Sequence, residues 1–447
     1  MPLYSQKAMD SPYWNEYLEC MPREKLNELH LRRLKGLIKY AYENVTMYKE
    51  IYDEAGVRPE DINTLDDYVK KLPAIDKKDV LACQSRRPPY GEAIVRGSED
   101  YISLFYMTSG TTGRPLMEPG YFKDIQQQWT HQWWAHGIRS SDVFYIAFPF
   151  GTFMGFWSAY FDAILLGAQV ISSGGQDSKG RIRQIVELKP TVLVATPTYI
   201  RHLAEIAREM GVDPASTSVK YLTVAAEKIT TLPHLREEFE TTWAAKALEI
   251  FGISELWGAA SFSCPNHPER LHLSESSGFG IVVDEKGDVV SNGGRGEFIL
   301  TSYNPTVMPL IKYRTHDVVE GHFEGCDCGR TWLWLQGGVL GRTDQMLKIK
   351  GTNVYPDGIE AILGEIKGLS GNLEIHVTSE EDGDAVSVKI EPKEGVPAGE
   401  YEALGRKARE ELKAKIGVSI WVEIVPPKSL PRYEVKGKKV IDHRVKK

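Results

Sequence analysis

Residues 142–255 alternate between two kinds of segment, and this alternation limits the fold more than any other feature of the chain. Five apolar or β-branched runs each end in small or turn-forming residues, and they read VFYIAFP, AQVISSGG, PTVLVATP, KYLTVAAE and ALEIFGISE. Between them, at 179–189, 198–210 and 231–245, apolar residues recur every three or four positions, as in amphipathic helices. The alternation predicts βαβ units and an α/β fold. We expect a mostly parallel sheet covered on both faces, with ligands at the carboxyl ends of its strands.

One apolar stretch suggests a competing interpretation. No residue between Asp142 and Asp162 is charged, which is about the length that a membrane-spanning helix needs. Pro149, Gly151 and Gly155 interrupt this stretch. We therefore predict a buried strand, a turn and the start of a buried helix instead.

The chain of 447 residues is longer than one hydrophobic core usually serves, so more than one domain is expected. Short strands joined by turn residues predict an antiparallel β subdomain at about 280–340. Beyond it, two alternating strands, a charged helix from Tyr401 to Gly417 and a basic tail predict a small α+β domain. We expect a large N-terminal domain over residues 1–343 and a small mobile C-terminal domain over 344–447.

The charge balance narrows the range of partners. The formal net charge is -7 and the pI is about 6.0, so no overall basic field favours nucleic acid or an anionic membrane. We expect small-molecule ligands, no nucleic acid and no membrane. The first residues lack the apolar region of an export signal, so we expect a cytoplasmic protein. The oligomeric state stays open, with a homodimer among the options.

A loop at residues 108–115, TSGTTGRP, is rich in backbone amides and hydroxyls and has little side-chain bulk. Such a loop suits the many acceptor oxygens of a polyphosphate. It differs from the P-loop, because Arg114 and Pro115 stand where lysine and serine or threonine are required. A flexible linker is the alternative, but the loop lies between an apolar run and an aromatic-rich segment. We therefore predict phosphate binding.

Five motifs together resemble the adenylate-forming superfamily of acyl-CoA ligases, and within it the phenylacetate-CoA ligase family. They follow the family's order from residue 108 to 444: TSGTTGRP at 108–115, FGISE at 251–255, YRTHD at 313–317, GRTDQMLKIKGTNVYP at 341–356 and LPRYEVKGKKVIDHR at 430–444. The resemblance implies an ATP-dependent enzyme. Such an enzyme activates a carboxylic acid as an acyl-adenylate, releases pyrophosphate, and then forms acyl-CoA and AMP.

The resemblance also implies a set of nucleotide-binding residues. Phe251 offers a flat face to a purine, Glu255 offers a hard carboxylate oxygen to Mg²⁺, and Asp317 can accept both ribose hydroxyls. Glu255 is assigned a catalytic role. The predicted ATP- and AMP-binding residues are Thr108, Ser109, Gly110, Thr111, Thr112, Gly113, Ala226, Glu227, Phe251, Gly252, Ile253, Ser254, Asp317 and Arg342.

The C-terminal segment should supply the second catalytic group. The family's register places Lys436 on the carboxylate and the α-phosphate, with Lys438 and Lys439 open as alternatives. A rotation of the small domain about Asp344 would exchange the lysine for the path of CoA. We expect Lys350, Gly351 and Tyr355 along that path.

An aromatic-rich segment at 129–156 is the candidate acid pocket, with His136, Tyr145, Phe148 and Gly151 as its lining residues. A buried core would explain the same composition equally well. The acid itself stays open. We expect an aryl acid such as phenylacetate or benzoate first, and a small branched or hydroxylated aliphatic acid second.

Three of the five cysteines suggest a metal site. Cys264, Cys326 and Cys328 with one histidine would form a closed tetrahedral zinc set, and hence a structural one. Relatives in the resembled family favour His272, and His267 is the alternative. Unrelated reduced cysteines are the competing interpretation.

Two other functions stay in competition. An adenylation enzyme of this kind could pass its acyl group to a carrier protein or an amine instead of CoA. A nucleotide-binding regulatory protein could retain the loop without the chemistry, although Glu255, Asp317 and Lys436 together argue against this.

Overall fold

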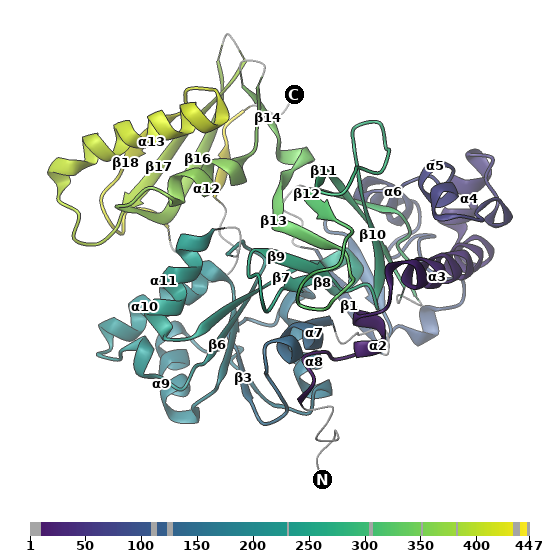
Figure 1. Ribbon diagram of the computed structural model, residues 1–447, viewed down its shortest axis with the longest axis horizontal. Coiled ribbons are helices and arrows are strands. Elements are labelled where there is room, and N and C mark those ends of the chain that lie inside the picture. The colour runs from purple at the N-terminus through teal and green to yellow at the C-terminus, as the bar shows by residue number, and fades with distance from the viewer. Residues whose placement is uncertain are drawn as a thin grey trace.

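The computed structural model describes residues 10–108, 114–122, 128–229, 232–303, 307–349, 352–380, 383–431 and 439–444. Figure 1 shows a large α/β domain and a smaller C-terminal domain that lies over one end of it, beside α10 and α11. This α/β architecture with two domains confirms the predicted fold class. In the described part of the chain, no helix combines the length and the apolar character needed to cross a membrane.

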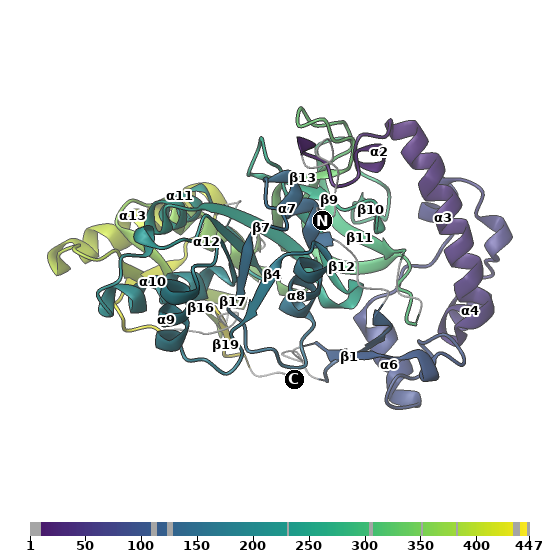
Figure 2. The same cartoon turned by 90° about the horizontal axis from the view of Figure 1, so that it is seen from below.

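The N-terminal hundred residues, for which the sequence pattern predicted no elements, form helices along one side of the large domain. Figure 2 shows α3 and α4 at the end of the molecule opposite the small domain. Leu26, Leu34, Ile38 and Ala41 of α3 recur at helical spacing and are buried. The helices are α2 (Glu16–Glu19), α3 (Arg23–Asn44), α4 (Thr46–Glu54), η1 (Pro59–Asp61), α5 (Leu65–Lys70), α6 (Lys77–Arg86) and η2 (Glu99–Tyr101).

The predicted βαβ region forms a parallel sheet, as its pattern indicated. Its strands β3 (Val143–Ile146), β4 (Gln169–Ser172), β5 (Val192–Ala195), β6 (Tyr221–Ala225) and β7 (Lys246–Ile253) lie in the order β4-β3-β5-β6-β7. The helices of this region are α7 (Gln128–Ala135), α8 (Gly155–Leu165), α9 (Ser178–Leu188), α10 (Pro197–Glu209), η4 (Pro214–Ser216) and α11 (Pro233–Trp243). The uncharged stretch after Asp142 is the strand β3, a turn and the buried helix α8, as predicted.

Antiparallel strands extend this sheet, so the predicted β subdomain is part of an eleven-stranded sheet. The antiparallel pairing begins earlier than predicted, at β8 (Gly258–Ser263). The sheet continues through β9 (Arg270–Leu273), β13 (Trp334–Arg342), β12 (Tyr313–His322), β11 (Gly294–Ser302) and β10 (Gly278–Val283). Turn residues allow a strand to reverse and pair with its neighbour, and they do not separate one sheet from the next.

Two short elements connect the sheet to the candidate site. The hairpin of β1 (Leu104–Met107) and β2 (Met117–Gly120) carries the segment 108–115 at its tip. The turn η5 (Ser254–Leu256) follows β7 and carries Glu255. Both elements therefore present residues of the predicted motifs next to strand ends.

The small domain has a core of its own, drawn from residues between Leu347 and Val440. It begins after η6 (Thr343–Gln345) with the hairpin of β14 (Leu347–Ile349) and β15 (Thr352–Val354). Its four-stranded sheet has the order β18-β17-β16-β19, with α12 and α13 packed against it. The bounds are α12 (Pro356–Gly364), β16 (Leu369–Glu380), β17 (Gly383–Pro392), η7 (Ala398–Glu400), α13 (Tyr401–Ile416), β18 (Trp421–Ile424) and β19 (Val440–Asp442).

Candidate active site

The best-defined part of the site lies at neighbouring positions of β12 and β13. Asp317 and Arg342 are paired across these strands, and Arg342 Nη1 donates to Asp317 Oδ1 at 3.0 Å. Burial raises the pKa of Asp317 to about 6, although Arg342 opposes this shift. Asp317 Oδ2 has no hydrogen-bond partner among the described residues. A buried carboxylate oxygen without a partner is suited to accept hydroxyl groups of a ligand.

Arg342 also ties this carboxylate to the predicted hinge. Its Nε and Nη2 donate to the two carboxylate oxygens of Asp344 at 2.9 and 2.8 Å. This bidentate pair lowers the pKa of Asp344 against the effect of burial. The predicted ribose position and the predicted hinge therefore share one guanidinium.

A second cluster joins the start of the phosphate loop to η5. Lys77 Nζ, at the N-terminus of α6, donates to Thr108 Oγ1 at 3.1 Å and lies 3.5 Å from Glu255 Oε1. Thr108 Oγ1 also accepts from the backbone of Leu116 at 3.0 Å, which fixes the base of the loop. A cation between a carboxylate and a hydroxyl is suited to hold phosphate oxygens near a metal-binding carboxylate. The rest of the predicted loop, Ser109–Gly113, lies outside the described residues.

Three residues near this cluster were not predicted from the sequence. They are Lys77, Glu118 and Tyr313. Burial raises the pKa of Tyr313 beyond its usual range, and the charge of Glu255 and a hydrogen bond to it raise it further. Tyr313 opens the YRTHD motif that ends at Asp317, and this shared motif was the sequence signal that could have identified it. Lys77 comes from the N-terminal region, and only the fold brings it to the site.

The predicted adenine-side residues lie at the ends of β6 and β7. Ala226 follows β6 with φ 72, which is unusual for a residue with a side chain and is found most often at functional sites. Glu227 accepts from the backbone and the hydroxyl of Thr198 at 3.0 and 2.6 Å, at the start of α10. Phe251 to Ile253 end β7, and Ser254 opens η5. These segments lie at the carboxyl ends of neighbouring parallel strands, where the sequence predicted ligands.

The four acid-pocket candidates do not share one environment. Tyr145 is buried among α9 and α10 residues, and its hydroxyl donates to Gln184 at 2.7 Å. His136 contacts Ser263 O at 3.0 Å, and burial lowers its pKa to about 3. Phe148 lies in a second core cluster, and Gly151 accepts from the Trp157 indole at 2.9 Å. Tyr145, His136 and Phe148 are buried at different places, and Gly151 is exposed in the loop that follows Phe148.

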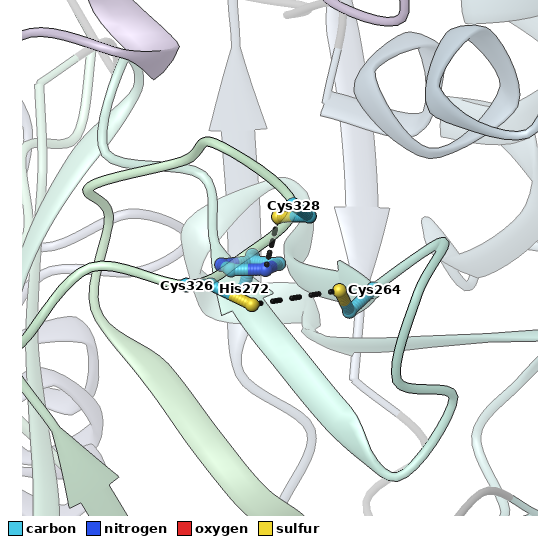
Figure 3. A group of neighbouring side chains, drawn as sticks. All are labelled: Cys264, His272, Cys326 and Cys328. Carbon is cyan, nitrogen blue, oxygen red and sulfur yellow. Dashed lines mark hydrogen bonds between the residues drawn. The ribbon is translucent and has the colours of Figure 1, made fainter.

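Four predicted metal ligands do come together. The ligand atoms of Cys264, His272, Cys326 and Cys328 all lie within 4.8 Å of one another. Figure 3 shows the four side chains grouped at one place. Cys264 Sγ lies 3.8 Å from Cys326 Sγ, and Cys328 Sγ lies 3.3 Å from His272 Nε2. Two sulfurs on a tetrahedral zinc ion at about 2.3 Å would be about 3.8 Å apart. The distances and the donor set therefore fit a tetrahedral metal ion.

Charged neighbours support thiolates at this position. Arg270 and Arg330 each donate a guanidinium N–H to a sulfur, at 3.5 Å to Cys326 and 3.7 Å to Cys328. His267, the alternative ligand, points elsewhere and contacts the carboxylate of Asp327 at 2.8 Å. The geometry therefore favours His272 in this set.

Comparison with known proteins decides the family. Residues 34–309 match the family described as AMP-binding enzyme, and residues 351–444 match the AMP-binding enzyme C-terminal domain. The chain belongs to the AMP-binding enzymes. A phenylacetate-coenzyme A ligase of Thermus thermophilus is 31% identical to it over 96% of this chain and 98% of its own. These matches confirm the predicted family and, with it, the predicted enzyme class of acid-thiol ligases.

A solved relative of this AMP-binding enzyme shares its domain arrangement. The structure of 2-hydroxyisobutyryl-CoA ligase in the postadenylation state, with its acyl-adenylate, has a TM-score of 0.91 at 28% identity. That match covers 99% of this chain and 94% of the other. The same ligase in the thioesterification state, with CoA, has a TM-score of only 0.74. The small domain is therefore oriented as in the state that follows adenylation.

Several contacts between described residues of the two domains accompany this orientation. Lys228 Nζ lies 2.7 Å from Asp357 Oδ2 of α12. The imidazole of His234 lies so close to Gly364 that a Cβ there would be 2.2 Å from the ring. The guanidinium of Arg201 lies against Gly371 in the same way, at 2.8 Å from such a Cβ.

The structure describes only some of the predicted residues of the hinge segment and of the C-terminal motif. Lys350, Gly351, Lys436 and Lys438 lie outside the described residues. Lys439 is described, and its Nζ contacts Glu360 of α12 at 2.5 Å. Tyr355 precedes α12 and packs on Gly341, which leaves no room for a side chain there.

Proposed function

We propose that this protein is an AMP-forming ligase that joins a small carboxylic acid to coenzyme A through an acyl-adenylate. The observation that carries the proposal is the buried Asp317, paired with the partly exposed Arg342, beside the group of Glu255, Lys77 and Thr108. The first pair suits a ribose, and the second group suits phosphates with Mg²⁺. Their place on an AMP-binding fold supports ATP as the ligand of both.

The first step needs positioned charge more than covalent chemistry. When the carboxylate attacks the α-phosphate, negative charge develops on phosphoryl oxygens, and nearby cations stabilise it. Lys77 is one such cation in the large domain, and we propose Lys436 as the second, from the small domain. Lys439 is tied to Glu360 within its own domain, which supports Lys436 or Lys438 over Lys439 in this role.

The residues of the hinge and the CoA path remain proposals. We propose that Asp344 is the pivot, that the domain boundary lies at 343–344, and that Lys350, Gly351 and Tyr355 contact the pantetheine after rotation. The two-domain fold and the arrangement of the postadenylation state support this assignment.

An aryl acid such as phenylacetate is the first candidate substrate, because a phenylacetate-CoA ligase matches nearly the whole chain. A small hydroxylated or branched aliphatic acid is the second, because a 2-hydroxyisobutyryl-CoA ligase shares the fold over 99% of the chain. Screening both classes for AMP and pyrophosphate release, with and without CoA, tests the proposal. Release only with a carrier protein or an amine would support the competing adenylation enzyme, and no release with any acid would contradict both.

We also propose a structural Zn²⁺ at Cys264, His272, Cys326 and Cys328. All four positions carry protein ligands, so the ion would have no open site for substrate. The five cysteines are free thiols, which agrees with a reducing cytoplasm as the location.

Metal content and chelation test the zinc proposal. We expect about one equivalent of zinc in the purified protein, and a chelator that removes it should lower Tm by several degrees. Cys328→Ser should lose most of the zinc, whereas Cys83→Ser, at a buried cysteine in α6, should keep all of it. Full stability without any bound metal would contradict the proposal.

A further inference from the structure

Glu118 on β2 is a buried carboxyl group for which the described residues provide no partner. Its side chain is fully buried, and neither carboxylate oxygen has a hydrogen bond within the described part of the chain. Burying such a group without a partner is strongly unfavourable, and native proteins rarely do it. Glu118 is therefore a candidate to pair with a polar group of a ligand.

The face of the hairpin on which Glu118 lies is defined by the strand register. Glu118 is directly opposite Tyr106 of β1, and residues directly opposite each other in an antiparallel pair point to the same face. Tyr106 packs edge-on against Trp257, with ring centroids 5.9 Å apart. Gly120, on the same face, lies against the Trp257 ring so closely that a Cβ would be 1.8 Å away.

Glu118 thus faces a small group of mostly aromatic side chains, which we call the aromatic cluster. Its buried members are Tyr106, Met154 and Trp257, with Leu104, Trp157 and Phe161 packed against them. Apolar side chains of this kind line the sites that bind the organic part of small acids. None of the four acid-pocket candidates predicted from the sequence belongs to it.

A second polar group of the aromatic cluster lacks a partner. The indole nitrogen of Trp257 makes no hydrogen bond to the described residues, and Trp257 is only 4% exposed. The indole N–H of Trp257 needs an acceptor, and the Glu118 carboxyl group can accept or, when protonated, also donate. A hydroxyl group both donates and accepts, so it can pair with either form of Glu118, whereas an ammonium group offers no acceptor and a methyl group offers neither.

The aromatic cluster also borders the reaction site. Thr108 follows Tyr106 by two residues, and Glu255 precedes Trp257 by two residues. Burial raises the pKa of Glu118 well above its usual range, the charge of Glu255 adds to this, and Lys77 opposes it. The electrostatic neighbours of Glu118 are therefore the same residues that we assign to the phosphates.

From these contacts we infer that Glu118 and Trp257 bind a hydroxyl group of the acid substrate and select hydroxy acids over their unsubstituted analogues. This inference rests on the proposed ligase function and names the substrate class within it. A site built to bond a hydroxyl discriminates strongly against an analogue without one, because its polar groups are then left buried and unpaired.

Matched pairs of acids test the inference. AMP release would be measured with isobutyrate and 2-hydroxyisobutyrate, butyrate and 3-hydroxybutyrate, and phenylacetate and 4-hydroxyphenylacetate. In the unmodified enzyme we expect kcat/KM to favour the hydroxylated member of at least one pair by more than tenfold. Glu118→Leu should lower that ratio at least tenfold, and Trp257→Phe should lower it severalfold.

Two controls separate this role from a structural one. Glu118→Gln keeps the shape and a hydrogen-bonding group, so it should retain more of the preference than Glu118→Leu. Phe105→Leu, on the opposite and exposed face of the hairpin, should leave the ratio unchanged.

Four results would overturn the inference. Equal use of both members of every pair would remove the hydroxyl preference while leaving the ligase function intact. An equal loss for both members in Glu118→Leu, or a changed Mg²⁺ dependence with an unchanged ratio, would assign Glu118 to structure or to metal binding. AMP release with no acid at all would instead remove the proposed function, and this inference with it.

Discussion

The two domains contribute to the site in different ways. In the large domain, Asp317, Arg342, Thr108 and Glu255 are held by strand pairing, by hydrogen bonds and by partly buried ion pairs. Among the described residues, the small domain meets it through an ion pair, close contacts at Gly341, Gly364 and Gly371, and the packing of Ala361 on a large-domain core cluster. The proposed nucleotide-binding residues therefore lie on one hydrogen-bonded sheet, whereas the small domain, to which we assign Lys436, docks on it through side-chain contacts. The proposed rotation of the small domain needs this difference, because the nucleotide must stay in place while the lysine leaves.

Removal of the proposed lysine should have the largest effect and should affect only one half-reaction. We expect Lys436→Ala to lower acid-dependent ATP–pyrophosphate exchange at least 100-fold, since one charged contact to the transition state contributes about 3 kcal/mol. Thioester formation from supplied acyl-adenylate should change less than threefold. Lys438→Ala serves as the matched control, and a loss of exchange there with none in Lys436→Ala would move the role to Lys438.

A smaller effect should follow from a substitution that disturbs the docking of the small domain on the large one but lies away from the reactants. In Gly364→Ala the new Cβ would clash with His234, so we expect pyrophosphate exchange to fall about tenfold. His234→Ala should restore most of it in the double variant. Gly358→Ala, in the same helix but with open space around its Cβ, should have no effect. If Gly364→Ala and Gly358→Ala behave alike, this contact does not hold the orientation.

The pH dependence of nucleoside binding should report on the protonation of Asp317 in the large domain. Because the pKa of Asp317 is about 6, its ionised form dominates above this pH and declines below it. Ribose hydroxyls donate to the ionised form, so Kd for adenosine should rise about tenfold from pH 7 to pH 5. Adenosine is the probe because it carries no phosphate that titrates in this range.

The raised pKa of Asp317 affects the folding stability in the opposite direction to ligand binding. The folded pKa of Asp317 lies above the usual 3.8, so burial of the charge costs stability above about pH 6. This cost is relieved as the pH falls from about 6 to about 4. In Asp317→Asn both the binding profile and this contribution should become flat, and an unchanged adenosine profile in that variant would exclude Asp317 as the titrating group.

The smallest effect should come from the ion pair between the domains. Lys228 and Asp357 are partly exposed, at 21% and 33%, so the pair should contribute at most about 1 kcal/mol. We expect Asp357→Asn to lower pyrophosphate exchange only two- to threefold, and less at high salt. Glu28→Gln, which removes an exposed pair in α3, is the control. A loss of more than tenfold would mean that this pair, and not the glycine contacts, holds the domain.

The prediction of the sheet succeeded where the pattern was local. Apolar strands and helices with three- and four-residue spacing were placed correctly from residue 142 to 255, because their periodicity lies within single segments. The extension of that sheet by β8 to β13 was not predicted, since pairing between distant strands leaves no trace in the spacing of one strand.

The sequence by itself determined the family and the order of the motifs, and it predicted that three cysteines and one histidine, His272 or His267, would come together. These features depend on residue identity at short spacing. Only the tertiary structure placed Lys77 beside Thr108, buried Tyr145, His136 and Phe148, and put Glu118 on the face of the aromatic cluster. The physical reason is that burial and the absence of a partner are properties of contacts between distant segments. A glutamate in a short strand resembles any solvated glutamate until the fold encloses it.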